Sequence, residues 1–464
     1  MYAGMLVISN DVMEPRVHFR EACKKTKEDR ERERERGKTA PSIKFETLAK
    51  ALQVSVTSAR RAEARSISDR VMYARNQQRA LTKTAVAGGT PITEELACEL
   101  RQVVFGTAVA PPRGEWLRTS VLFNAPEKET AFGLKTPKNG TRGLVAVLQA
   151  FVIKHLLFEK KDCTDPPEEL LKPNRMRQLD AITMAMAEIL WKIAEQTTVS
   201  QNKTEVSEKP IVSMVLPQEN TYIQHSINYF QDGLTERLHV FEFTEYDELQ
   251  IFIKRYLYLF LDESCPGCLL FLYSAVATRG TARVERDLDG IKGYMVTAAE
   301  EGSECIITLL LCGRATPYLH NGVVYVGDEE HYAVPQWGML SRNEIGFLYF
   351  EEKLDDQSKV PGSRLKTPAL PIWVIFCNGH YAVVFNTNRE LLRNYHAERR
   401  FDLVYYSPGG STCTLTVDTS QDDDGKLELN EEDTSSTSAN NVEKLIHTKW
   451  QDAQITWHGQ IAFT

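Results

Sequence analysis

The segment "NGTRGLVAVLQAFVIKHLLF" (residues 139–158) decides the fold, because a polar, glycine-containing loop runs directly into a long apolar stretch. The stretch predicts a buried helix over Gly143–Phe158. The loop before it presents a side chain at the positive end of the helix dipole, where an anionic reactive group would be stabilised. The residue presented there is Arg142, whose guanidinium stays protonated and has no nucleophilic lone pair available.

Further along the chain, helical spacing is followed by strand-like runs. Apolar residues recur at helical intervals over Met176–Glu195. Short β-branched and aromatic runs bounded by turn residues predict strands at Ser303–Gly313, Ile345–Phe350, Ile372–Asn378 and His380–Asn386. Helices first and strands afterwards are typical of an α+β fold rather than a doubly wound sheet.

Composition and charge exclude several classes of protein. The 464 residues are 42% hydrophobic and 25% charged, which is typical of a globular protein, and the net charge of -8 argues against a dedicated nucleic-acid binder. The apolar runs are far shorter than the roughly 20 residues that a membrane-spanning helix needs, and the N-terminus lacks a signal-peptide pattern. Nine cysteines, mostly isolated in apolar contexts, fit reduced thiols. We therefore expect a soluble cytoplasmic or nuclear protein that is not secreted and does not bind a membrane.

Two parts of the chain carry opposite charge. Residues 1–90 hold 19 Lys and Arg and 11 Asp and Glu, so the remainder carries a net charge of -16. We expect residues 1–90 to be a basic, partly disordered extension with one or two amphipathic helices within residues 43–80. A Gly/Pro linker, "AGGTPIT" (Ala87–Thr93), leads to a globular domain over residues 91–464. The acidic, Ser/Thr-rich stretch at residues 418–441 predicts a disordered insertion.

Most elements of a Cys–His active site can be recognised. In such sites a nucleophilic cysteine at a helix start pairs with a histidine that a distant strand supplies. His380, which stands between two strand-like runs more than 200 residues after Arg142, is the candidate histidine. The alternative for His380 is a structural histidine that forms hydrogen bonds within its own sheet. The layout therefore indicates cysteine chemistry, but the sulfur is absent from its expected position.

No other thiol replaces it by sequence position. Cys98 and Cys163 are too distant along the chain to be assigned to this helix start. "CPGC" (Cys265–Cys268) has the spacing of a redox motif, but it follows no obvious strand-to-helix switch and has no second pair for zinc, so we favour structural thiols over redox or metal chemistry. The remaining histidines show no metal-ligand spacing; they include His320, His331 and His447.

Several segments together resemble the MINDY family of deubiquitinases, and most closely its inactive branch, designated four-B. They are Phe132–Phe158, "LYSAVATRG" (Leu272–Gly280), "CGRATPYLHNG" (Cys312–Gly322), "PIWVIFCNGHYAVVF" (Pro371–Phe385) and "KLIHTKWQDAQITW" (Lys444–Trp457). The resemblance covers roughly residues 91–464. It implies a papain-related α+β domain whose family prefers lysine-48-linked polyubiquitin, and it implies no cofactor and no metal.

The resemblance also assigns the site residues. The family has a glutamine, five further residues and then the catalytic cysteine, so the nucleophile position falls on Arg142 and the glutamine position on Thr136, while His380 matches the family's histidine. Loss of the nucleophile removes the covalent route, and loss of one oxyanion donor typically costs about 10² to 10³ in rate. We therefore expect a pseudoenzyme that binds polyubiquitin. The alternatives are a residual deubiquitinase with an unidentified nucleophile and a scaffold that does not bind ubiquitin. The sequence does not indicate the oligomeric state.

Overall fold

The described part of the chain begins after the basic extension. The computed structural model describes residues 83–112, 114–136, 140–159, 165–198, 209–288, 294–327, 334–353, 356–407, 409–420 and 437–459, which belong to the compact unit Leu81–Thr464. The helices expected within residues 43–80, and the rest of the extension up to residue 82, lie outside the described residues. Thr93, at the end of the predicted linker, caps the first described helix, because its Oγ1 accepts a hydrogen bond from the Leu96 amide at 3.2 Å.

Two apolar helices form the centre of the helical part. They are α5 (Arg142–Leu157) and α7 (Arg175–Thr198), and both confirm the helices predicted from spacing. Two further buried helices, α10 (Gly267–Arg279) and α12 (Glu304–Cys312), pack against them. The remaining helices are α3 (Glu94–Phe105), α4 (Gly114–Arg118), α6 (Pro167–Leu170), α8 (Tyr246–Tyr256), α9 (Tyr258–Leu261), α11 (Thr281–Asp287), α13 (Ser363–Lys366) and α14 (Thr437–His447), with 3₁₀ turns η2 (Thr235–Arg237) and η3 (Gln357–Lys359).

One predicted strand is wrong. The run Ser303–Gly313 forms α12, which ends where Gly313 adopts a left-handed φ of 78°. Every residue from Cys305 to Leu311 is buried. A helix that is buried all around shows no amphipathic period, and its β-branched residues then suggest a strand.

A six-stranded sheet forms the second part of the fold. The three strands predicted by pattern are confirmed as β8 (Gly346–Phe350), β9 (Ile372–Cys377) and β10 (His380–Phe385). The sheet continues through β11 (Arg400–Tyr406), β12 (Thr412–Asp418) and β13 (Gln454–His458), with β8 parallel to β9 and the other neighbours antiparallel. Helices and strands are thus both present, as the α+β prediction requires.

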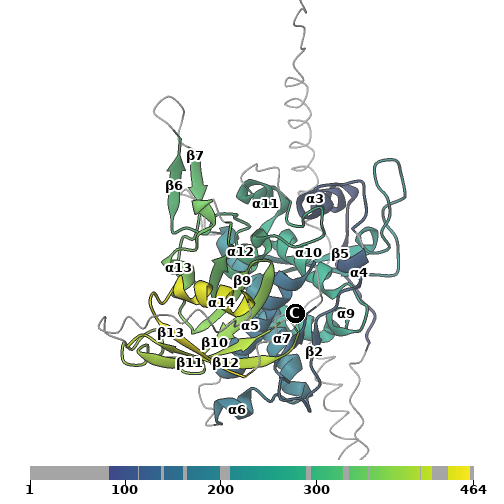
Figure 1. Ribbon diagram of the computed structural model, residues 1–464. Coiled ribbons are helices and arrows are strands. Elements are labelled where there is room, and N and C mark those ends of the chain that lie inside the picture. The colour runs from purple at the N-terminus through teal and green to yellow at the C-terminus, as the bar shows by residue number, and fades with distance from the viewer. Residues whose placement is uncertain are drawn as a thin grey trace, which may run out of the picture. The chain divides into compact units, whose positions relative to one another are not determined.

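The two faces of this sheet pack against different helices. Tyr381, Val383 and Phe385 of β10 belong to the large core that contains α5. Ala382 and Val384 belong to a second core that contains α14. Figure 1 shows α14 lying against the sheet, and its contacts with β8 and β9 agree. Alternate residues of β10 therefore belong to separate environments.

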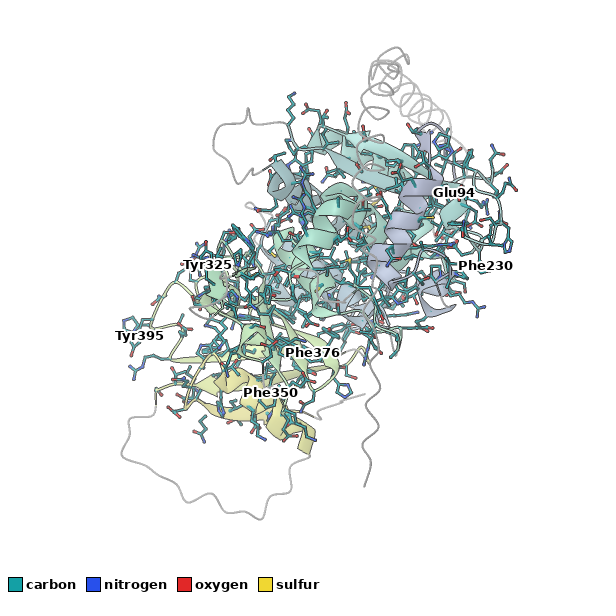
Figure 2. The ribbon with its side chains drawn as sticks, turned by 90° about the horizontal axis from the view of Figure 1, so that it is seen from above. Glu94, Phe230, Tyr325, Phe350, Phe376 and Tyr395 are labelled. Atoms are coloured by element: carbon teal, nitrogen blue, oxygen red, sulfur yellow. The ribbon has the colours of Figure 1, made fainter. Side chains whose placement is uncertain are left out.

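The described residues also form smaller sheets. β1 (Thr90–Pro91), β5 (Leu238–Phe243) and β4 (Val212–Pro217) form a three-stranded sheet, and β2 (Leu122–Phe123) pairs with β3 (Leu134–Lys135). β6 (Val323–Val326) and β7 (Val334–Trp337) form a hairpin that projects from the other elements in Figure 1. Figure 2 shows Tyr325 of this hairpin at the periphery, where it is 68% exposed, whereas Phe376 of β9 lies nearer the middle of the view and is half-buried.

The predicted disordered insertion has different limits in the structure. Asp418, its first residue, is the last residue of β12, and α14 begins at Thr437, inside the predicted insertion. The first residues of α14 read Thr-Ser-Ala-Asn-Asn, which lack large apolar side chains and so could not be distinguished from a loop by pattern. Residues 421–436 lie outside the described part of the chain.

Candidate functional site

Helix α5 starts between a sheet and another helix. It contacts α7, α12, β9 and β10, and every residue from Gly143 to Leu156 is buried. A Cβ atom at Gly143 would lie 2.8 Å from Ile307 Cδ1 and 3.2 Å from Tyr381 Cζ. The first turn of α5 is therefore packed so closely that a larger residue at this position would have to displace the Ile307 side chain.

Arg142 is the first residue of α5, and it forms an ion pair. Its Nη2 lies 2.9 Å from Glu301 Oε1, and the two side chains are 17% and 30% exposed. A cation at the positive end of a helix dipole costs roughly 0.3 to 1 kcal/mol when exposed, so it requires solvent or an anion. The anion is Glu301. The sequence does not identify this partner, because 158 residues lie between Arg142 and Glu301 and only the fold brings the two side chains together.

Glu301 also binds the backbone at the helix start. The Gly140 amide donates to Glu301 Oε2 at 3.1 Å, and the Gly302 amide donates to the Gly140 carbonyl oxygen at 2.9 Å. The indole of Trp116 donates to the Glu300 carbonyl oxygen at 2.9 Å. These hydrogen bonds hold the segment Glu300–Gly302 against the loop before α5. The Glu301 carboxylate therefore lies next to the helix start.

Thr136 is half-buried and directly follows β3. Residues 137–139, which connect it to Gly140, lie outside the described residues. Among the residues that the structure does describe, no hydrogen bond or ion pair joins Thr136 to Arg142. Its assignment to the glutamine position therefore stays a prediction.

The structure does not bring His380 beside Arg142. His380 is exposed, and it lines a cavity of about 110 Å³ together with Cys377, Tyr405 and Val442 on the α14 side of the sheet. The residue of β10 that faces the start of α5 is Tyr381, whose pKa burial raises and the nearby Arg142 lowers, with burial the larger effect. The expected pairing of the two site residues is thus absent from this arrangement, and the match of His380 to the family's histidine stays a prediction.

Two other thiols approach the start of α5. Cys268, the second residue of α10, lies against the hydroxyl of Thr141, the N-cap of α5. Cys305, near the start of α12, lies close enough to Tyr381 to affect its pKa. Both are buried, and burial raises the pKa of each thiol to about 12. Neither is therefore the exposed, readily ionised thiol that attack on an external ubiquitin bond requires.

A cluster at the far end of α5 could be taken for a metal site. Ligand atoms of His155, Glu159 and Glu188 all lie within 4.8 Å of one another. Lys154 forms ion pairs with Glu159, with Glu188 and, at 3.0 Å, with Glu344. The carboxylates thus already have a cation, and the contacts of 3.0 Å from both His155 nitrogens to carboxylates favour a protonated imidazole over a metal ligand.

The remaining histidines named above have structural surroundings or lie outside the described residues. His447 Nε2 is 2.9 Å from the Ala453 carbonyl oxygen, and His320 stacks on Tyr318 with ring centroids 5.8 Å apart. His331 and Cys163 lie outside the described part of the chain. Cys98 is half-buried at the surface of α3, with a pKa that burial raises.

Comparison with known proteins identifies this arrangement. The conserved-domain model described as "Deubiquitinating enzyme MINDY-3/4, conserved domain" matches residues 101–459, which include α5, Glu301 and the whole six-stranded sheet. The chain belongs to the MINDY-3/4 deubiquitinase family. Arg142 therefore stands at the start of the central helix of a deubiquitinase domain.

Individual relatives support the family assignment. The chain is 31% identical to the "Probable ubiquitin carboxyl-terminal hydrolase MINDY-4" of Xenopus tropicalis over 375 residues, which are 80% of this chain and 46% of that protein. It is 29% identical to the human MINDY-4 over 376 residues, with the same coverage. It is 28% identical to the human "Ubiquitin carboxyl-terminal hydrolase MINDY-3" over 309 residues, which are 64% of this chain and 67% of that protein.

The match leaves part of these relatives uncovered. The chain spans about half the length of the MINDY-4 proteins that it matches. No solved structure matches it. Among the described residues, no helix combines the length and apolar character needed to cross a membrane.

Proposed function

We propose that this domain is a catalytically inactive deubiquitinase homologue that binds lysine-48-linked polyubiquitin through a vestigial cysteine-hydrolase cleft. The observation that carries the proposal is the ion pair of Arg142 with Glu301 at the start of α5, 2.9 Å long. In a papain-related domain this position would hold the nucleophile, because the helix dipole and free amides there stabilise a thiolate. A guanidinium paired with a carboxylate offers no nucleophile.

The proposal assigns three vestigial positions. Arg142 takes the place of the nucleophile, Thr136 that of the glutamine, and His380 that of the histidine. The position of His380 on the α14 face of the sheet supports inactivity, since a general base must come within hydrogen-bonding reach of the proton that it removes. Burial raises the pKa of Tyr381, the β10 residue that faces the start of α5 instead, so its phenol stays protonated at neutral pH and cannot act as that base.

Ubiquitin binding does not require the nucleophile. A cleft that holds an extended peptide uses backbone hydrogen bonds and apolar contacts over many residues. The names of the relatives describe them as ubiquitin carboxyl-terminal hydrolases or probable ones, so ubiquitin is the ligand class that we propose for this chain. We propose a cytoplasmic or nuclear location and no role in binding nucleic acid or membranes, in keeping with the net charge of -8.

Two alternatives make different predictions. A residual deubiquitinase would need a thiol near α5, and Cys268 is the nearest candidate, although its burial opposes this role. A scaffold that has lost ubiquitin binding would retain the fold alone. Cleavage of polyubiquitin would distinguish the residual deubiquitinase from the proposed inactive homologue. Binding of polyubiquitin chains would distinguish the inactive homologue from the scaffold.

The test uses the full chain with lysine-48-linked tetraubiquitin. We expect capture of the chains on immobilised protein, weaker capture of monoubiquitin, and no release of monoubiquitin over time. Arg142→Ala should leave the absence of cleavage unchanged. Release of monoubiquitin that disappears in Cys268→Ser would support the residual hydrolase, and failure to capture any chain while the protein is folded would support the scaffold.

A further inference from the structure

The cysteine motif "CPGC" occupies the start of a buried helix. α10 begins at Gly267, Pro266 is its N-cap, and Cys268 is its second residue. The element before the motif is the helix α9, so the motif does not follow a strand, but it does lie at a helix start. A Cys-x-x-Cys motif at a helix N-terminus is the arrangement in which thiol–disulfide exchange proteins hold their reactive pair.

The two thiols differ in access and lie close together. Cys265 is half-buried, whereas Cys268 is completely buried. Burial raises the pKa of Cys268, and the nearby Cys265 raises it further. The Gly267 amide, one of the free donors of the first turn of α10, points at the Cys265 sulfur and lowers the pKa of this thiol, against the larger effect of burial. A half-buried cysteine thus stands at the helix start beside a completely buried one.

The backbone of the motif is held in place. A Cβ atom at Gly267 would lie 2.3 Å from the Phe260 carbonyl oxygen, so only glycine allows α10 to start so close to α9. The Cys268 amide donates to the Thr119 carbonyl oxygen at 3.0 Å, and the Cys265 amide donates to the Asp262 carbonyl oxygen at 3.3 Å. These contacts fix both cysteines on one turn of chain.

A buried hydroxyl points to the second sulfur. Thr141 is completely buried, and its Oγ1 has no hydrogen-bond partner with ordinary geometry among the described residues. It lies against Cys268, where its hydroxyl lowers the pKa of the thiol. A hydroxyl in this position can stabilise a thiolate that forms on Cys268 during exchange.

We propose that Cys265 and Cys268 are a thiol–disulfide redox pair, with Cys265 as the attacking thiol and Cys268 as the resolving thiol. With oxidised glutathione as the oxidant, the Cys265 thiolate attacks one sulfur of the disulfide and releases the first glutathione thiolate. The Cys268 thiolate then attacks the Cys265 sulfur and releases the second. Both cysteine protons pass to the released glutathione thiolates through solvent, so two protein thiols are oxidised and one glutathione disulfide becomes two glutathione thiols.

Oxidation would also alter the surroundings of Arg142. Disulfide formation turns the Cys268 sulfur toward Cys265, so that Thr141, the residue directly before Arg142, loses its sulfur contact. The pair therefore couples the redox state of the chain to the start of α5. This coupling does not depend on ubiquitin binding.

The test is carried out on the folded full chain. The protein is equilibrated in glutathione buffers of increasing oxidising strength, its free thiols are blocked with N-ethylmaleimide, and peptides are mapped by mass spectrometry. We expect a Cys265–Cys268 disulfide, seen as the loss of two hydrogen atoms from one peptide and of two blocked thiols. The rate should rise with pH, because burial raises the pKa of both thiols, to about 11 and about 12.

Three variants complete the test. Cys265→Ser and Cys268→Ser should each abolish the disulfide, and Cys265→Ser keeps the test valid if the buried substitution prevents folding. Cys98→Ser is the matched control, since Cys98 is another half-buried thiol with a raised pKa, and it should leave the disulfide unchanged. A stable mixed disulfide of glutathione on Cys265, no oxidation at all, or a disulfide that forms only in denaturant would each overturn the proposal.

Discussion

The coupling between Arg142 and Glu301 can be measured as a free energy. Their Nη2–Oε1 distance is 2.9 Å, and both side chains are mostly buried, at 17% and 30% exposure. At this separation two unit charges attract by about 1.4 kcal/mol in water and by about 6 kcal/mol at an effective dielectric constant of about 20. Desolvation and lost side-chain entropy oppose this attraction, so we expect a net coupling of about 1 to 2 kcal/mol.

A double-mutant cycle isolates that value. Urea unfolding is measured for the unmodified chain, Arg142→Gln, Glu301→Gln and the double variant, and the non-additive part is the coupling. Glutamine at position 301 keeps an oxygen that can accept from the Gly140 amide, so the cycle reports the charge pair alone.

An exposed pair provides the control for this cycle. Arg393 and Glu390 lie 3.6 Å apart with side chains 49% and 57% exposed, and we expect a coupling of at most about 0.5 kcal/mol. If the Arg142–Glu301 coupling were no larger than the control, Arg142 would not be held by Glu301, and the reasoning from this ion pair to the proposed inactivity would fail.

Two further predictions concern α5. Burial lowers the pKa of His155, but hydrogen bonds and charges from two glutamates raise it more, so the folded-state pKa lies above the ordinary 6.5. The stabilisation from the protonated imidazole is therefore complete below pH 6.5 and is lost as the pH rises through the folded-state pKa. Unfolding free energies measured from pH 6 to 9 should therefore fall in the unmodified chain relative to His155→Gln, and parallel curves would contradict this. Gly143→Ala should destabilise the fold by about 1 kcal/mol in thermal unfolding, because a close contact with Ile307 costs about 1 to 3 kcal/mol and outweighs the roughly 1 kcal/mol of helix propensity gained; a higher Tm would contradict it.

α7 could be predicted from the helical spacing of its apolar residues, and α5 from the length of its apolar run. β8, β9 and β10 could be predicted from short β-branched and aromatic runs bounded by turn residues. α12 could not, since burial on all sides removes the period that distinguishes a helix from a strand. The predicted end of the acidic insertion lies inside α14, because the first turn of this helix has no large apolar residue that would mark it as a helix.

The candidate site was predictable in its parts but not in its contacts. Arg142 at a helix start follows from the order of residues, and so does its need for an anion. The anion, Glu301, could not be identified, because only the folded chain brings the two segments together. The face of the sheet on which His380 lies could not be predicted either, because both faces of β10 are apolar and the usual alternation of polar and apolar residues is missing.

The turn between β9 and β10 sets the strand register, and the register decides which residue of β10 faces Arg142. Asn378 and Gly379, with φ of 45° and 86°, form a two-residue turn that aligns Cys377 with His380. Because side chains alternate along a strand, a change of one residue in the register would exchange the environments of His380 and Tyr381. In the present register, a cysteine restored at position 142 would meet the phenol of Tyr381. Recovery of a hydrolase from this scaffold would therefore require a one-residue change of register in the hairpin as well as a new nucleophile.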